Sequence, residues 1–259
     1  MRLCVLGVAG VLAAMPALAG VLDDLAAGRD ARSPQLAGVV GVVAGPKGVL
    51  RAEAAGLADL ATGRAITPDT PLRVASISKL VVAIAVMRLV EQRRLDVDRD
   101  VSDYLGWRLR NPAFPDTPVT LRRLMSHTSG LVDGPGYSFP LEDTVQGRLT
   151  AQHWAGAPGS RFQYCNLNWG IIASVMEAAT GARFDRLMQR LVLQPLQLDA
   201  GYNWQGASDV AIAKAAVLYR KGADEAHWQP DGPWVAQVDD LHGQRPACPV
   251  ASRAACDLA

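Results

Sequence analysis

Ser76 and Lys79 stand three positions apart, where a polar loop gives way to a long apolar run that begins at Leu80. Such a run after a polar loop predicts a helix that starts near Ser76. Side chains three positions apart lie on the same face of a helix. A serine hydroxyl becomes a good nucleophile when a neighbouring base removes its proton. The spacing therefore predicts a nucleophile, Ser76, and a base, Lys79, at one helix start.

The surroundings of this pair favour the same chemistry. The apolar run predicts a mostly buried setting for Lys79, and desolvation lowers the pKa of a lysine. The backbone N–H of Ser76 is expected to supply half of an oxyanion hole, because amides at a helix start lack intrahelical partners. The alternative is a chance pair on the surface. No other serine precedes a lysine by three positions, and the apolar run disfavours a surface location.

Tyr164-Cys165-Asn166 is the second candidate motif, directly before another apolar run. Residues two apart in an extended segment point to the same side. A tyrosine can transfer a proton when nearby positive charge lowers its pKa, and an asparagine can both donate and accept hydrogen bonds. We expect Tyr164 to share proton transfer with Lys79, and Asn166 to orient the lysine and a substrate carbonyl. Packing beside a helix cap is the alternative role for Tyr164.

The two motifs together resemble those of the penicillin-recognising serine hydrolases, which include class C β-lactamases, D-alanyl-D-alanine carboxypeptidases, D-aminopeptidases and related esterases. The resemblance covers about residues 35–200 and extends to three further segments. These are Thr67-Pro68-Asp69-Thr70, the turn His127-Thr128-Ser129-Gly130, and Thr180-Gly181 with the later Leu193-Gln194-Pro195-Leu196.

The resemblance implies an α+β fold of the β-lactamase/transpeptidase type, with an antiparallel sheet flanked by helices and a mostly helical region. It also implies an acyl-serine mechanism on an amide, β-lactam, D-amino-acid peptide or ester. Ser76, Lys79 and Tyr164 would be catalytic, Asn166 would bind substrate, and no metal or other cofactor would be needed. The expected partner is a small-molecule or peptide substrate.

Two rival functions remain open. A Ser-His-Asp esterase using His127 is disfavoured because the chain has no Gly-x-Ser-x-Gly elbow. We expect His127 to be a loop histidine bonded to nearby backbone. A catalytically silent module of the same fold, binding peptidoglycan or β-lactams, is the second rival. The family's third motif, Lys-Thr-Gly or His-x-Gly, has no clear match, and His242-Gly243 is expected to lie in a loop.

Charge and composition exclude other classes. The chain has 26 basic and 25 acidic side chains, a net charge of +1, and no basic run, so nucleic-acid binding is not expected. A hydrophobic content of 49% with 20% charged residues is typical of a globular protein. Oligomeric state cannot be predicted from these features.

Residues 1–19 are predicted to be a secretory signal peptide. Arg2 precedes an apolar stretch, Pro16 is expected to break the helix, and Ala17-Leu18-Ala19 fits a small-residue cleavage site. We therefore expect a periplasmic or secreted protein whose domain spans residues 20–259, without stable membrane association. An uncleaved anchor is the alternative.

The cysteines suggest structural roles. Cys165 is expected to be a small buried thiol rather than a nucleophile. Cys248 and Cys256 are close enough in sequence to form a disulfide in an oxidising compartment, although their pairing stays open. A zinc site from these two residues and His242 is disfavoured because it lacks a fourth ligand and a recognised spacing.

The pattern of elements supports an α+β chain with residues 65–200 as its mainly helical part. Residues 36–44 and 49–55 are predicted to form a β-hairpin, and helices are predicted over 21–29, 76–92, 101–105, 120–125, 167–180, 184–192 and 208–219. A hairpin alone is marginally stable. Since residues 244–259 show no strand pattern that could supply the missing partners, we expect the sheet to be incomplete and the sequence to be a C-terminally incomplete copy of a longer hydrolase.

Overall fold

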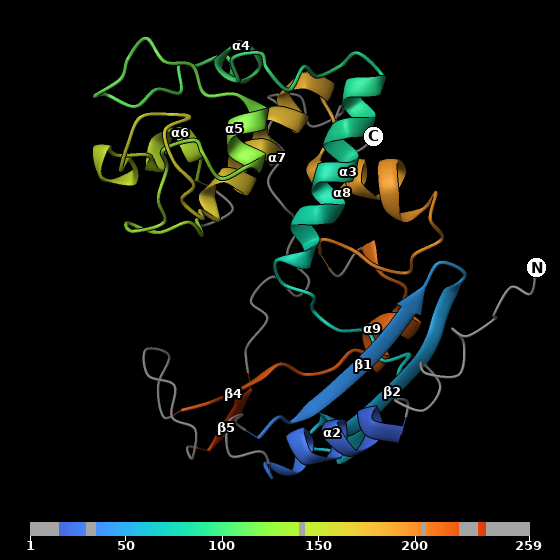
Figure 1. Ribbon diagram of the computed structural model, residues 1–259. Helices are drawn as coiled ribbons and strands as arrows, with labels where there is room; N and C mark the ends of the chain where they lie inside the picture. Colours follow the sequence, from blue (N-terminus) through green and yellow to red (C-terminus); the bar gives the residue numbers. More distant parts are fainter. Residues whose placement is uncertain (1–15, 30–34, 140–142, 204–205, 223–232, 237–259) are drawn as a thin grey trace, which may run out of the picture. The chain divides into compact units, whose positions relative to one another are not determined.

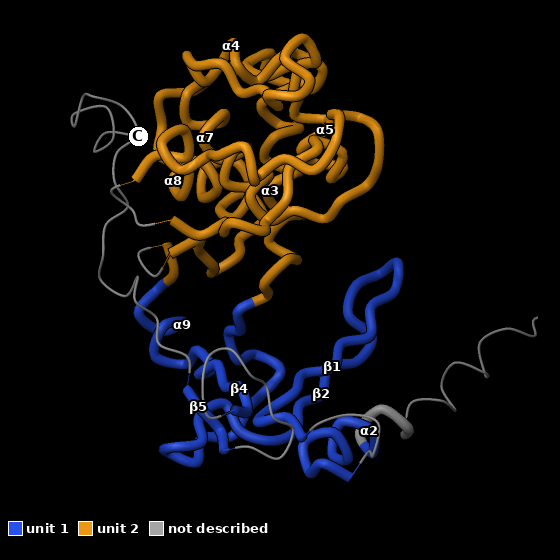
Figure 2. Tube along the Cα trace, turned by 90° about the vertical axis from the view of Figure 1, so that its left-hand side faces the viewer, with its two compact units in different colours: residues 1–73, 208–240 blue, residues 74–207, 241–259 orange. Residues whose placement is uncertain are grey.

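A computed structural model of the chain describes residues 16–29, 35–139, 143–203, 206–222 and 233–236. The chain divides into two units, coloured separately in Figure 2. Unit 1 contains residues 1–73 and 208–240, and unit 2 contains residues 74–207 and 241–259. Among the described residues, no helix is long and apolar enough to span a membrane.

A three-stranded antiparallel sheet forms the main part of unit 1. Strands β1 (Gly38–Gly45) and β2 (Gly48–Asp59) make the predicted hairpin, and β3 (Arg64–Ala65) pairs with the far end of β2. The last pair of the hairpin register is Gly45 with Gly48, so two residues form the turn. The prediction missed β3 because the polar composition of its segment indicated a loop.

Helix α2 (Pro16–Ala27) packs against β1 and β2 at the edge of unit 1 (Figure 1). It begins at Pro16, and the preceding residues, whose helix Pro16 was expected to break, lie outside the described part of the chain. Proline has a backbone angle suited to the first turn of a helix, where its missing N–H has no consequence. The first 15 residues of the predicted signal peptide lie outside the described residues, and cleavage stays a prediction.

The second sheet of unit 1 replaces part of a predicted helix. Helix α9 (Asp209–Lys214) starts at its predicted cap, Ser208, but ends early, and β4 (Tyr219–Lys221) pairs with β5 (Trp234–Ala236). Between α9 and β4 the backbone bonds to distant segments instead: Val217 N–H donates to the Ala58 carbonyl. Tertiary hydrogen bonds therefore override the local helical pattern.

Unit 2 is built on two long helices, α3 (Ile77–Glu91) and α7 (Leu167–Thr180), as predicted (Figure 1). The predicted helix over 184–192 is α-helical in α8 (Phe184–Met188) and continues as a π-helical turn, η2 (Gln189–Leu193). Side chains from these elements and from α5 form one buried apolar cluster, whose fully buried members include Leu89, Leu121, Leu124, Leu167, Ile171, Ile172, Met176, Leu187 and Met188.

Helix α3 is buried on one face. Val82, Ala85, Val86 and Leu89 face the apolar cluster. Ile77, Leu80, Ile84 and Met87 are exposed in the described structure. The helix is therefore not buried on every side, although its early part is apolar all round. An all-apolar sequence cannot by itself show which face a helix buries.

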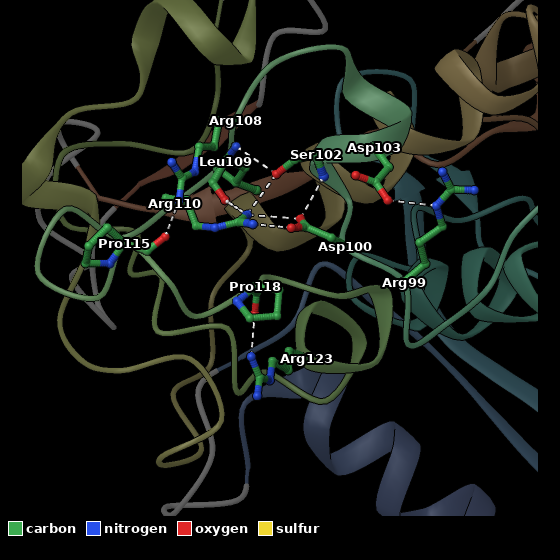
Figure 3. Close-up of polar contacts among 10 residues, drawn as sticks. All are labelled: Arg99, Asp100, Ser102, Asp103, Arg108, Leu109, Arg110, Pro115, Pro118 and Arg123. Carbon is green, nitrogen blue, oxygen red and sulfur yellow. Dashed lines mark hydrogen bonds and ion pairs between the residues drawn. The ribbon is translucent and has the colours of Figure 1, made fainter.

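The short helices of unit 2 are held by capping and by arginines. They are α4 (Ser102–Leu105), α5 (Leu121–Met125), α6 (Val145–Arg148) and the 3₁₀ turn η1 (Ala151–His153). The Thr120 side chain caps α5 as predicted. Figure 3 shows Arg110 donating to Asp100, to the Ser102 hydroxyl and to the Leu109 carbonyl, which fixes the segment before α5. The same view shows Arg123 donating to the Pro118 carbonyl.

Candidate active site

Ser76 occupies the N-cap position of α3, at the end of a tight turn. The preceding residue, Ala75, has a positive φ of 42°. Ile77 N–H donates to the Val74 carbonyl at 3.0 Å, which closes the turn around Ser76. A positive φ is uncommon and unfavourable for a residue with a Cβ, and such conformations cluster at functional sites. The turn leaves Ser76 exposed at the start of the helix.

The four predicted site residues lie together in unit 2. Lys79 Nζ lies 2.9 Å from Ser76 Oγ, and the Tyr164 hydroxyl lies 2.8 Å from the same oxygen. Lys79 also donates to Asn166 Oδ1 at 2.9 Å. Ser76 Oγ is therefore in hydrogen-bonding contact with both groups that were predicted to take up its proton.

Positive charge near Tyr164 favours its ionised form. Lys79 Nζ lies 5.1 Å from the centre of the Tyr164 ring. The Lys79 ammonium, and after it the hydrogen bond with Ser76, holds the pKa of Tyr164 below its usual value. Tyr164 itself is 43% exposed, so a substrate or water can reach it.

The setting of Lys79 differs from the prediction. Its side chain is half-buried, and its recorded partners are Ser76 and Asn166 rather than apolar groups. Leu80, the next residue, is exposed. The expected apolar, mostly buried environment is therefore wrong, because the polar motif on residues 164–166 lies against the lysine.

Asp133 is a site residue that the sequence analysis missed. Its Oδ1 accepts from Cys165 Sγ at 3.2 Å and from Leu167 N–H at 3.0 Å. Its Oδ2 accepts from the backbone N–H of Asn166 at 2.9 Å and from Asn166 Nδ2 at 2.8 Å. Burial acts to raise the pKa of Asp133, but the donors on Asn166 and Leu167 outweigh burial and lower it.

His127 behaves as the predicted loop histidine. Its Nδ1 accepts from the Cys165 backbone N–H at 3.0 Å, and its ring stacks on Tyr164 with centroids 4.4 Å apart. Burial first, and then the charge of Lys79, lowers its pKa. A neutral imidazole accepts through one nitrogen, so Nε2 carries the proton and the 3.5 Å contact from Trp169 Nε1 is not a hydrogen bond. His127 thus supports the ring of Tyr164.

Cys165 is the buried thiol that was predicted. Burial, with the neighbouring Asp133 carboxylate, raises its pKa to about 12, so it stays protonated and can donate. Cys248, Cys256 and the segment His242-Gly243 lie outside the described residues. The described ranges contain no cluster of three or more His, Cys, Asp or Glu side chains that could hold a metal ion.

Comparison with models of known protein families assigns the chain to one of them. The model of the family described as Beta-lactamase matches residues 21–253. The chain belongs to the beta-lactamase family. The helices and small antiparallel sheets of the structure agree with this family's α+β fold, as the sequence predicted. The family includes serine hydrolases of several specificities, as the relatives of this chain show.

Two curated relatives and one solved structure illustrate that range. Esterase EstB of Burkholderia gladioli is 35% identical over 221 residues, which cover 78% of this chain and 55% of EstB. The D-aminopeptidase of Brucella anthropi is 27% identical over 224 residues, which cover 79% of this chain and 41% of the aminopeptidase. The octameric penicillin-binding protein homologue from Pyrococcus abyssi shares the fold, with a TM-score of 0.67 at 23% identity, covering 86% of this chain and 50% of the homologue. The chain therefore spans about half the length of these proteins.

Proposed function

We propose that this chain is an exported serine hydrolase that acts through an acyl-serine intermediate on an amide, a β-lactam, a D-amino-acid peptide or an ester. The observation that carries the proposal is the contact of Ser76 Oγ with both Lys79 Nζ and the Tyr164 hydroxyl, at 2.9 and 2.8 Å. A serine with a base and a cation at hydrogen-bonding distance is arranged for nucleophilic attack.

The first half of the reaction would acylate Ser76. The Ser76 hydroxyl donates its proton to Tyr164, whose lowered pKa favours the phenolate as the acceptor. Ser76 Oγ forms a bond to the acyl carbon, and the bond from that carbon to the leaving alcohol or amine breaks. The proton held by Tyr164 passes to the leaving group. Lys79 stabilises the negative charge on both oxygens throughout.

The second half would release the acyl group. A water molecule gives a proton to Tyr164 and attacks the acyl carbon, and the bond to Ser76 Oγ breaks as the proton returns to Ser76. Asn166 holds Lys79 in place through its Oδ1. One of its two amide hydrogens is directed to Asp133, and the other is available to a substrate carbonyl. No step in this sequence calls for a metal or another cofactor.

Esters are the first substrates to test. The relative that is 35% identical is named an esterase, and the relative that is 27% identical over a similar length is named a D-aminopeptidase. For these reasons we rank esters before D-amino-acid peptides and β-lactams. The proposed location is the periplasm or the extracellular medium, on the basis of the signal-like segment over residues 1–19.

The experiment is covalent labelling of the full chain with a fluorescent penicillin and with a fluorophosphonate, beside Ser76→Ala. We expect the fluorophosphonate to label the wild type and not the variant. Labelling that persists in Ser76→Ala would place the nucleophile elsewhere. A folded wild-type chain that neither probe labels would favour the silent binding module over the hydrolase.

A further inference from the structure

We infer that Asp133 is a positioning residue for the acyl-transfer site: it fixes the side-chain amide of Asn166 so that the oxygen, and not the nitrogen, faces Lys79. This inference rests on the proposed function for its effect on rate. Its structural content, the link between Asp133 and Asn166, can be tested without any activity.

The Asp133 carboxylate gathers three consecutive residues. It accepts four hydrogen bonds, from the Cys165 thiol, from the backbone N–H groups of Asn166 and Leu167, and from Asn166 Nδ2. The two backbone donors open helix α7, where N–H groups have no intrahelical partner. The carboxylate thus ties the Tyr164-Cys165-Asn166 segment to the loop that follows the His127 turn.

One of these four bonds determines the chemistry that Asn166 offers to the site. An ionised carboxylate only accepts hydrogen bonds, so the atom of Asn166 at 2.8 Å from Asp133 Oδ2 must be the amide nitrogen. The amide oxygen is therefore directed to the other side, where it accepts from Lys79 Nζ at 2.9 Å. With the amide reversed, two donors would face each other at Lys79.

The charge of Asp133 also acts on the proton acceptor. The negative carboxylate raises the pKa of Tyr164, opposing the larger lowering by Lys79 and Ser76. Removal of this charge would lower the pKa of any nearby acid. A residue that served only to cap α7 would not fix the orientation of the Asn166 amide.

The test is Asp133→Asn in the full chain. The two backbone donors lie on different carboxylate oxygens, so a single amide oxygen cannot serve both, and the new NH₂ group would meet a donor. We expect kcat/KM for p-nitrophenyl acetate to fall about 10- to 100-fold, mainly through kcat. The ascending limb of its pH profile, which follows the ionisation of Tyr164 as the proton acceptor, should move to lower pH by about half a unit.

Asp100→Asn is the matched control. Asp100 also accepts a backbone N–H, that of Ser102, and is paired with Arg110 (Figure 3). We expect this variant to lose thermal stability. Its kcat should stay within about threefold of the wild-type value, and its pH profile should shift by no more than about two-tenths of a unit. An equal loss of kcat in both variants, or an unchanged rate and profile in Asp133→Asn, would overturn the inference.

A double-mutant cycle separates this inference from the proposed function. The melting temperatures of Asp133→Asn, Asn166→Ala and the double variant should be non-additive, because each single change breaks the same hydrogen bond. Additive losses would overturn the link between the two residues. If Ser76 proves unreactive while the cycle is non-additive, the proposed function fails and the positioning of Asn166 stands.

Discussion

The N-terminal end of helix α3 and the β1–β2 hairpin differ in how their side chains find partners. Around Ser76, each predicted polar group has a hydrogen-bonding partner within unit 2. In the hairpin of unit 1, the apolar side chains of Val42, Val49 and Leu50 are 57%, 66% and 54% exposed. The site thus rests on the core of its own unit, whereas the hairpin depends on its backbone ladder and on α2.

The largest expected effect comes from removing the polar groups that contact Ser76. Tyr164→Phe and Lys79→Ala should each slow labelling of Ser76 by about 10²- to 10⁴-fold, because Tyr164 takes the serine proton and Lys79 stabilises the negative charge that remains. Labelling rates with the fluorophosphonate measure this. Tyr137→Phe, at another exposed tyrosine of unit 2, is the control and should label at the wild-type rate. Near-normal labelling of Tyr164→Phe and Lys79→Ala would show that both roles are wrongly assigned.

Truncating one leucine in each unit compares how much side-chain packing contributes to the stability of the two units. Leu124 is fully buried in unit 2, so Leu124→Ala should lower the free energy of unfolding by about 3 kcal/mol. Leu50→Ala, in the hairpin, should change it by less than about 0.5 kcal/mol. Urea denaturation of the full chain gives both values. Similar losses would mean that Leu50 is covered in solution and that the contrast between the units is wrong.

A pH effect is expected from Glu177, which is half-buried on α7. Burial raises the pKa of this carboxyl to about 7 in the folded chain, against 4.5 for a free one. The folded state therefore holds the proton more tightly, and stability should fall as pH rises from about 4.5 to about 7 and then level off.

Glu177→Gln should remove this dependence. The free energy of unfolding of the variant minus that of the wild type should increase by roughly 2 kcal/mol as the pH rises from 4.5 to 7.5. Urea denaturation across that range measures the gain. Glu91→Gln, at an exposed position of α3, is the control and should show no such trend. Parallel wild-type and Glu177→Gln curves would contradict the buried setting.

The smallest expected effect compares one helix cap in each unit. Thr120 is buried and accepts from Arg123 N–H at the start of α5, so Thr120→Ala should cost about 1 kcal/mol. Ser208 accepts from Ala211 N–H at the start of α9, a helix whose one buried described residue is Ala211. Ser208→Ala should cost about 0.5 kcal/mol or less. Thermal unfolding of both variants ranks them, and the reverse order would break the comparison.

The sequence could predict that the four candidate residues lie together because they belong to two local motifs. Ser76 and Lys79 share one helix turn, and Tyr164 and Asn166, two residues apart, contact that pair. The contact of Asp133 with Asn166 could not be predicted because the two residues are 33 positions apart. No spacing rule connects a loop carboxylate with a motif that far along the chain. A carboxylate two residues after the Gly130-Leu131 turn was the available signal.

The fold was predictable where periodicity and caps agree. Helices α3 and α7 and the hairpin follow from apolar runs, from Gly181 at a left-handed C-cap and from the Gly45–Gly48 turn. Strands β3, β4 and β5 were missed because short strands are defined by their partners rather than by their own sequence. The exposed face of α3 was missed for a related reason, since burial depends on the neighbouring elements.

The most direct test of the central claim is a peptide map of the full wild-type chain after reaction with the fluorophosphonate. The account predicts one adduct, on the serine at position 76, whose hydroxyl lies between Lys79 and Tyr164. An adduct on any other residue, or a folded chain that remains unmodified, would contradict it.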